Sequence, residues 1–217
     1  MIERSYRWLF WSLALAGLLL DQAGKYGMFH WLYVHGQPDP SRPDVRILEV
    51  VPGAFRFSAS FDYWPNARTE PTLITRLQTL GGPEVPQVNH GALFGLGHSY
   101  EHLANNVFAF ISIAAAVAII YWSTRRSMVQ DGRLCAALGL ILAGTLGNLY
   151  DRLVFYGVRD FLHFYWIEWP VFNIADSCLV CGAFLLLAQA LWSRPSAHDA
   201  VPARAKISSE PAEAKSA

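Results

Sequence analysis

Four stretches of this sequence continue without a single charged side chain, and they restrict the possible folds more than any other feature. These stretches are Trp8–Leu20, Leu103–Thr124, Leu134–Tyr150 and Ser177–Ser193. A bilayer core of about 30 Å needs roughly 20 helical residues to cross it, so each stretch can span if a few flanking residues are included. The sequence therefore predicts an all-α integral membrane protein, with four transmembrane helices at about residues 8–29, 103–122, 133–152 and 174–192.

The basic residues predict the orientation of these helices. They lie before the first helix, in the short loop between the second and third, and after the fourth: Arg4, Arg7, Arg125, Arg126, Arg133, Arg194, Arg204, Lys206 and Lys215. The positive-inside rule therefore places both termini in the cytoplasm; residues 30–102 form a loop too long for its arginines to count. The net charge of zero says nothing about a nucleic-acid partner, but we find no basic patch, so none is expected.

The first apolar stretch also has features of a signal peptide. No small-residue cleavage site follows it. Instead Asp21 to Lys25 follows, and apolar residues then resume. We therefore expect this segment to stay attached as an anchor.

The region over residues 30–102 should contain regular structure of its own. Val45–Val51 and Ala54–Ser60 are rich in β-branched and aromatic residues and flank Pro52-Gly53, which predicts a hairpin. Thr69 to Leu80 predicts a short amphipathic helix with Leu73, Leu77 and Leu80 along one buried side. The tail over residues 193–217 has little apolar content and is expected to be disordered.

Unusual polar residues gather at one depth of the predicted bundle. Asp21 and Asn148 each lie about 20 Å from the cytoplasmic end of their helix at 1.5 Å per residue, and Asn173 and Asp176 open the fourth helix from the outside. Asp21 and Lys25 are four residues apart, which favours an ion pair. Whether that pair only tolerates burial or has a functional role is left open.

Asp160 and Asp176 are the candidate reactive pair. Two carboxylates that share a site cannot both ionise cheaply, so one keeps a proton, and the pair can activate water while protonating a leaving group. The alternative is that each acid is separate and hydrated, or is paired with Arg152 or Arg159.

Two other classes of site compete with this pair. His98 to His102, with Glu101 between them, fits an inverted zinc-protease pattern, for which His90 or Glu84 would have to supply a third ligand. An ion transporter would need polar side chains deep in the second and third helices, and they are absent there. Cys178 and Cys181 form a Cys-x-x-Cys pair within a predicted span, where small apolar side chains are the simpler interpretation.

Five ordered motifs resemble those of the lipoprotein signal peptidase family, signal peptidase II. They are Asp21-Gln22-x-x-Lys25, Asn89-x-Gly91-Ala92-x-Phe94-Gly95, Gly147-Asn148-Leu149-x-Asp151-Arg152, Val158-x-Asp160-Phe161 and Phe172-Asn173-x-Ala175-Asp176-Ser177. The resemblance covers about residues 1–192, and the five motifs together are highly specific.

The resemblance implies a bacterial inner-membrane aspartic peptidase with four transmembrane helices and a small periplasmic β-cradle. Such an enzyme removes signal peptides from prolipoproteins and cuts before a diacylglyceryl-modified cysteine, with no metal or other cofactor. By resemblance Asp160 and Asp176 are the catalytic pair, and the active site faces the periplasm. The residues that would bind or orient substrate are Asn89, Gly91, Asn148, Arg152, Asn173 and Ala175, whereas Asp21, Lys25 and Asp151 would be structural. The expected partners are prolipoproteins and the lipid bilayer, and the chain is expected to act as a monomer.

One segment departs from the family pattern. Between Lys25 and Asn89 the chain has about twice the usual number of residues, and the surplus falls at residues 61–87. We hypothesise that this insertion, with its short helix, lies across the substrate entrance.

Overall fold

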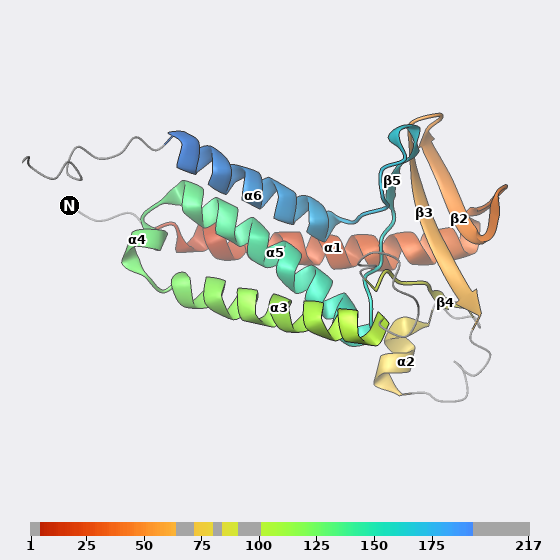
Figure 1. Ribbon diagram of the computed structural model, residues 1–217, viewed down its shortest axis with the longest axis horizontal. Coiled ribbons are helices and arrows are strands. Elements are labelled where there is room, and N and C mark those ends of the chain that lie inside the picture. The colour runs from red at the N-terminus through yellow and green to blue at the C-terminus, as the bar shows by residue number, and fades with distance from the viewer. Residues whose placement is uncertain (1–4, 64–71, 80–83, 91–100, 193–217) are drawn as a thin grey trace, which may run out of the picture.

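Four long helices form a bundle, and a small antiparallel sheet covers one end of it (Figure 1). The computed structural model describes residues 5–63, 72–79, 84–90 and 101–192. The long helices are α1 (Arg7–His35), α3 (Glu101–Trp122), α5 (Gly132–Val154) and α6 (Ile174–Trp192), and the short α4 (Arg126–Val129) lies between α3 and α5. Gly91, the predicted tail over 193–217 and parts of the insertion fall outside the described residues.

Three of these helices are long and apolar enough to cross a membrane: His102–Trp122 in α3, Gly132–Val154 in α5 and Ile174–Trp192 in α6. The longest helix, α1, is not among them, because Asp21, Gln22 and Lys25 interrupt its apolar run. Three helices therefore have the length and composition of a membrane span, and the predicted count of four is not confirmed.

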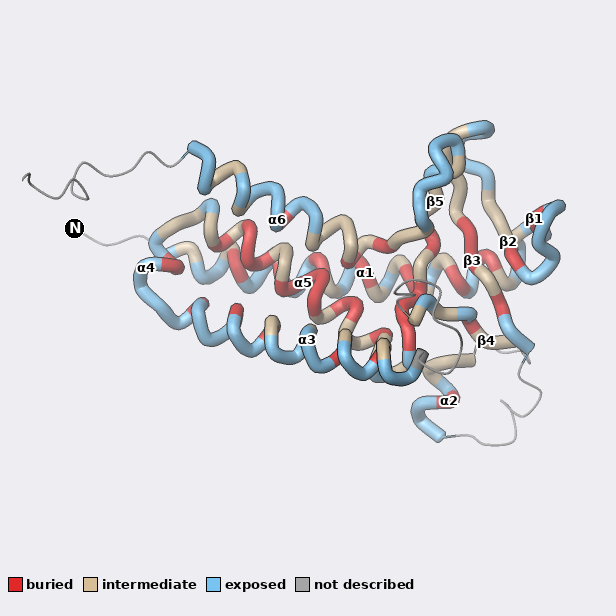
Figure 2. The backbone as a smooth tube through the Cα atoms, in the orientation of Figure 1, coloured by how far each residue is buried: buried red, intermediate tan, exposed pale blue. Residues whose placement is uncertain are grey.

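Helix α5 is the centre of the bundle and packs against α1, α3 and α6. Its buried residues form an almost continuous line in Figure 2. Small residues allow this contact: a Cβ added at Gly144 would lie 2.3 Å from the carbonyl oxygen of Ala175 in α6, and one at Gly139 would lie 2.7 Å from that of Phe10 in α1. The small residues of this helix thus serve close helix contact.

The sheet has strand order β1-β2-β3-β4, with β5 also paired to β3, and every pairing is antiparallel. The predicted hairpin is confirmed: β2 (Arg42–Val51) pairs with β3 (Phe55–Tyr63) across a turn in which Gly53 has φ +79°. The other strands are β1 (Gln37–Asp39), β4 (Glu84–Pro86) and β5 (Leu162–Phe164), which is followed by a 3-10 helix (Tyr165–Ile167). A five-stranded sheet is a substantial part of the fold, so the class all-α is not confirmed.

The two faces of β3 have different roles because side chains alternate along a strand. Phe57, Ala59 and Phe61 pack with Phe29 and Leu32 of α1 in one apolar cluster. The alternate residues line a cavity on the opposite face: Arg56, Ser58, Ser60 and Asp62. One strand thereby joins the sheet to the bundle and presents a polar surface beside it.

The short helix of the insertion differs from its prediction. Helix α2 spans Leu73–Gln78 and begins after Thr72, whose hydroxyl accepts a bond from the Thr75 backbone N–H; Thr69 and Leu80 lie outside the described residues. At the predicted leucine face, Leu73 is 74% exposed and Leu77 is half-buried, so the protein itself covers this face only in part. Gln78 Nε2 donates to the carbonyl oxygen of Val154 at 2.6 Å, so a polar contact joins α2 to the end of α5.

Two glycine substitutions test the helix contacts. Gly144→Ala should lower the free energy of unfolding by about 1–3 kcal/mol through overpacking, because its Cβ has no room beside the Ala175 carbonyl. The matched control is Gly27→Ala, where a Cβ meets nothing within 4 Å and where alanine should stabilise the helix by about 0.5–1 kcal/mol. Thermal unfolding in detergent measures both; equal midpoints would contradict the packing described for α5 and α6.

Candidate active site

A buried lysine joins two acids from different helices at the base of the site. Lys25 Nζ lies 2.9 Å from Asp21 Oδ2 on α1 and 3.4 Å from Asp151 Oδ2 on α5, and all three side chains are 0% exposed. The ion pair predicted between Asp21 and Lys25 is therefore formed. Each of these charges needs its partner, because a buried charge is tolerated only when it is paired and hydrogen-bonded.

The same lysine determines how the amide of Asn148 is oriented. Lys25 Nζ donates to Asn148 Oδ1 at 3.1 Å, and Asn173 Nδ2 donates to the same oxygen at 3.2 Å. Because a lysine ammonium can only donate, the oxygen of Asn148 must face it. The Nδ2 of Asn148 is thereby turned to Asp176, and it donates to Oδ1 at 2.8 Å.

Asp176 is held by the cap of its own helix. Asn173 precedes α6, and its Oδ1 accepts a bond from the Asp176 backbone N–H at 2.9 Å, while the Asn173 N–H donates to Asp176 Oδ2 at 3.2 Å. This reciprocal arrangement follows the logic of a capping box. It leaves the Nδ2 of Asn173 to donate to Asp160 Oδ1 at 2.7 Å. One asparagine thus binds both candidate acids.

Asp160 comes from the segment between α5 and α6. Its Oδ2 accepts a bond from Asn89 Nδ2 at 3.1 Å, and Asn89 is held in turn by two backbone bonds of 2.8 Å to Val158. Burial raises the pKa of the Asp160 carboxyl to about 6; the Asn89 bond opposes this rise and the nearby charge of Asp176 adds to it. The carboxyl therefore keeps its proton to a higher pH than an ordinary aspartate does.

In the described ranges, neither of the two arginines considered as partners forms an ion pair with the acids, although the charges of Asp176 and Asp160 act on Arg152. Arg159 forms an ion pair of 2.8 Å with Asp151. Arg152 donates to the carbonyl oxygen of Asn148 at 3.3 Å, with its guanidinium over the ring of Phe108. Within the described chain neither arginine is ion-paired to Asp160 or Asp176, so the interpretation of two separately paired acids is wrong.

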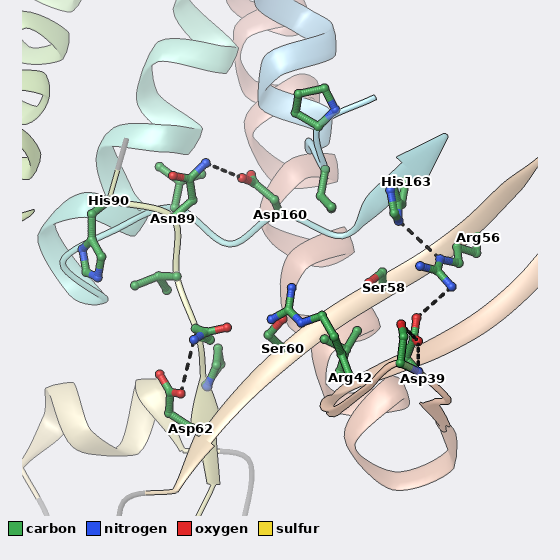
Figure 3. A pocket seen from close by; sticks show the side chains of 18 residues that line it. Asp39, Arg42, Arg56, Ser58, Ser60, Asp62, Asn89, His90, Asp160 and His163 are labelled. Atoms are coloured by element: carbon green, nitrogen blue, oxygen red, sulfur yellow. Dashed lines mark hydrogen bonds and ion pairs between the residues drawn. The ribbon is translucent and has the colours of Figure 1, made fainter. Parts of the chain in front are cut away.

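A cavity of about 840 Å³ opens beside Asp160 (Figure 3). Asp160 and Asn89 lie at one side of it, Ser58 and Ser60 of β3 line the middle, and Arg56 lies at the other side. There Arg56 pairs with Asp39 at 2.9 Å and donates to His163 Nδ1 at 3.3 Å. The space is large enough for several residues of an extended peptide and is mostly polar where it meets the sheet.

The remaining predicted site residues are placed as follows. Ala175 contributes its backbone, since its N–H donates to Asp21 Oδ1 at 2.8 Å. Sequence reasoning gave no separate role to Gln22 and considered Arg159 only as a partner of Asp160 or Asp176. In the structure Gln22 Nε2 donates to Asp21 Oδ2 at 3.0 Å, and Arg159 is 1% exposed against Asp151. The position of Arg159 directly before the motif residue Asp160 could have drawn attention to it. The sequence did not reveal that its side chain is buried.

The zinc alternative rested on His98 and His102. His98 lies outside the described residues, and in the described part of the chain no group of three histidine, cysteine or acidic residues is arranged to hold a metal ion. Cys178 and Cys181 are free thiols, the first half-buried and the second exposed.

The family model and the relatives that match this chain all belong to one kind of protein. The sequence model of the family described as signal peptidase (SPase) II matches residues 85–192. A lipoprotein signal peptidase of Rhodopirellula baltica is 34% identical over 205 residues, which cover 88% of this chain and 74% of that protein. A lipoprotein signal peptidase of Polynucleobacter necessarius is 40% identical over 113 residues, covering 48% of this chain and 68% of the relative.

Two solved structures share the fold. Both are described as bacterial membrane enzyme structures obtained by the in meso method. They match with TM-scores of 0.60 and 0.61 at 21% and 22% identity, over 88% and 89% of this chain and 92% and 99% of theirs.

Three helices long and apolar enough to span, together with the match to the signal peptidase II model, point to a bacterial membrane protein. The chain belongs to the signal peptidase II family, the lipoprotein signal peptidases, which are proteases of lipoprotein processing.

Removal of the buried ammonium tests the base of the site. Lys25→Met should lower the free energy of unfolding by about 3–5 kcal/mol, because it leaves the buried carboxylate of Asp21 without a cation and Asp151 with Arg159 alone. The matched control is Arg42→Met, which breaks an exposed pair with Asp44 and should cost at most about 1 kcal/mol. Denaturation in detergent compares them, and equal losses would contradict the role given to Lys25.

Proposed function

We propose that this chain is an aspartic endopeptidase that removes signal peptides from diacylglyceryl-modified prolipoproteins. Asp160 and Asp176 act as a dyad that activates water to cut the peptide bond before the lipidated cysteine. The observation that carries the proposal is the placement of both carboxylates on one asparagine: Asn173 donates to Asp160 Oδ1 at 2.7 Å through its side chain and to Asp176 Oδ2 at 3.2 Å through its backbone.

The two acids have different environments, which suits them to different roles. The raised pKa of Asp160, about 6, favours its protonated form. Asp176 lies in the first turn of α6, where the helix macrodipole favours a negative charge. We therefore assign the shared proton of the resting dyad to Asp160 and the charge to Asp176.

The proposed reaction follows from that assignment. Asp176 takes a proton from a water molecule while the oxygen of that water attacks the scissile carbonyl carbon. At the same time Asp160 donates its proton to the carbonyl oxygen. A tetrahedral intermediate forms, and a proton passes from Asp176 to the amine of the cysteine as the carbon–nitrogen bond breaks. The dyad returns to its starting state when Asp160 regains the proton of the intermediate's hydroxyl group.

The proposed topology brings the substrate to this site. The arginines of the loop from α3 to α5 lie at the end of the bundle opposite the sheet (Figure 1), which supports cytoplasmic termini and an active site at the outer face. With α1 as a fourth span, Asp21 and Lys25 would be neutralised inside the bundle. The diacylglyceryl chains could then stay in the outer leaflet while the peptide bond reaches the polar cavity.

Conservative changes of the dyad test the chemistry. Asp160→Asn and Asp176→Asn should each reduce cleavage of a purified diacylglyceryl-modified prolipoprotein below detection, because an amide cannot perform the proton transfers of a carboxyl group. The matched control is Asp62→Asn, which alters another acid that lines the same cavity and should retain activity. All three should fold with wild-type circular dichroism. Full activity in either dyad variant would refute the catalytic role of that aspartate. If EDTA abolished activity and zinc restored it, the result would favour a metalloenzyme.

The pH dependence of kcat/KM tests the proton assignment. Activity should fall as pH rises through the pKa of Asp160, about 6, because the proton needed for the carbonyl oxygen is lost. Asn89 and Asn173 donate to this carboxyl, and the charges of Asp176, Lys25 and Arg152 act on it. Asn89→Ala removes a bond that stabilises the ionised form, so the alkaline limb should move to higher pH.

His163 is the control for that experiment, because it lines the same cavity and burial lowers the pKa of its imidazole below the ordinary value. His163→Gln should leave the alkaline limb where it is in the wild type. A limb that disappears in His163→Gln, or that does not move in Asn89→Ala, would contradict the assignment to Asp160.

A further inference from the structure

Arg159 immediately precedes Asp160, and the proposed reaction does not use it. Although it carries a full charge, its side chain is 1% exposed, and it is the largest fully buried side chain among the described residues. The motif Val158-x-Asp160-Phe161 leaves its position open. A buried arginine has to be explained by what it contacts, because charges are rarely buried unless they are paired.

Three donors of Arg159 converge on Asp151 of α5. The backbone N–H donates to Oδ2 at 2.9 Å, Nε donates to the same oxygen at 3.2 Å, and Nη2 donates to Oδ1 at 2.8 Å. The side-chain pair is bidentate, which is the strongest and most directional form of this interaction. Main chain and side chain of one residue are thus fixed to a single carboxylate, one residue before Asp160.

The rest of the guanidinium is also constrained. Nη2 donates to Gln22 Oε1 at 3.0 Å, and the guanidinium carbon lies 3.8 Å from the ring centroid of Phe155 and 4.2 Å from that of Tyr26. Contacts with two rings and two polar partners leave Arg159 little freedom to move, so the position of the adjacent residue is restricted as well.

Charge balance connects Arg159 to the second acid of the dyad. Asp21, Lys25, Asp151 and Arg159 are all buried, and their two negative and two positive charges cancel. Without Arg159, Asp151 would keep only Lys25 as a cationic partner, now 3.4 Å away. Asp151 would then attract Lys25 away from Asn148. Lys25 orients the amide of Asn148 so that it donates to Asp176.

We propose that Arg159 is a positioning residue for the dyad: it fixes the chain at Asp160 through Asp151 and leaves Lys25 to orient Asn148 for Asp176. The inference rests on the proposed function of the two aspartates. Arg159 touches neither the substrate nor the reacting atoms, so it should affect the rate of the chemical step and leave substrate binding nearly unchanged.

Three variants and a control test this role in the full-length protein in detergent, with a diacylglyceryl-modified prolipoprotein as substrate. Arg159→Met should lower kcat by about 10²-fold, the cost of a misplaced catalytic group, while KM changes little. Arg159→Lys keeps the charge but loses the bidentate contact, so its kcat should lie between those of Arg159→Met and the wild type. Arg133→Met removes an exposed arginine and should match the wild type.

A double variant separates positioning from stability. Asp151→Asn with Arg159→Met restores a neutral buried set. The amide oxygen introduced at position 151 can still accept the backbone N–H of residue 159, so kcat should rise above that of Arg159→Met. Amide exchange over residues 155–176, measured by mass spectrometry, should be faster in Arg159→Met than in the wild type or Arg133→Met.

The outcomes distinguish the positioning role of Arg159 from the catalytic role of the two aspartates. Folded Arg159→Met with wild-type kcat would overturn the positioning role. If Arg159→Met does not fold, the neutral double variant decides: a reduced kcat at unchanged KM supports the role, and wild-type kcat overturns it. Asp160→Asn is assayed in the same series, and full activity there would instead refute the dyad itself.

Discussion

The contact of Lys25 with Asp21 and Asp151 is the constraint on which the rest of the site depends. The three side chains are fully buried, and desolvated charges are stable only if each one keeps its partners. The lysine cannot turn from donor to acceptor, so it fixes the amide of Asn148. Asn148 and Asn173 then place hydrogen-bond donors on Asp176 and Asp160. A buried charge that looks only structural thereby determines the geometry of the candidate dyad.

The sheet completes this arrangement from the other side. Its apolar face packs on α1, and its polar face, with Ser58 and Ser60, lines the cavity beside Asp160. The backbone bonds between Asn89 and Val158 tie the segment after β4 to the segment that carries Asp160. Bundle and sheet therefore hold the two acids jointly, and neither part alone would define the site.

Much of this could be predicted from the sequence because it depends on local patterns. Uncharged runs indicated the helices, Pro52-Gly53 indicated the hairpin, and Asn173 with Asp176 indicated the start of α6. The pairing of β5 with β3 could not be predicted, since Phe55 and Phe164 meet through tertiary packing. The burial of Arg159 was missed for the same reason. The exposure of Leu73 in α2 could not be predicted, because periodicity shows which side chains are aligned and not whether protein is available to cover them.

The coupling between the two aspartates tests the central claim most directly, and it can be measured without substrate. Aspartate carboxyl carbons labelled with ¹³C are followed by NMR against pH in the wild type and in Asp176→Asn. The account predicts a pKa of about 6 for the Asp160 carboxyl in the wild type, and a lower pKa for it in Asp176→Asn, because the neighbouring negative charge is gone. An unchanged pKa of Asp160 in that variant would show that the two acids do not share a site, and it would contradict the dyad.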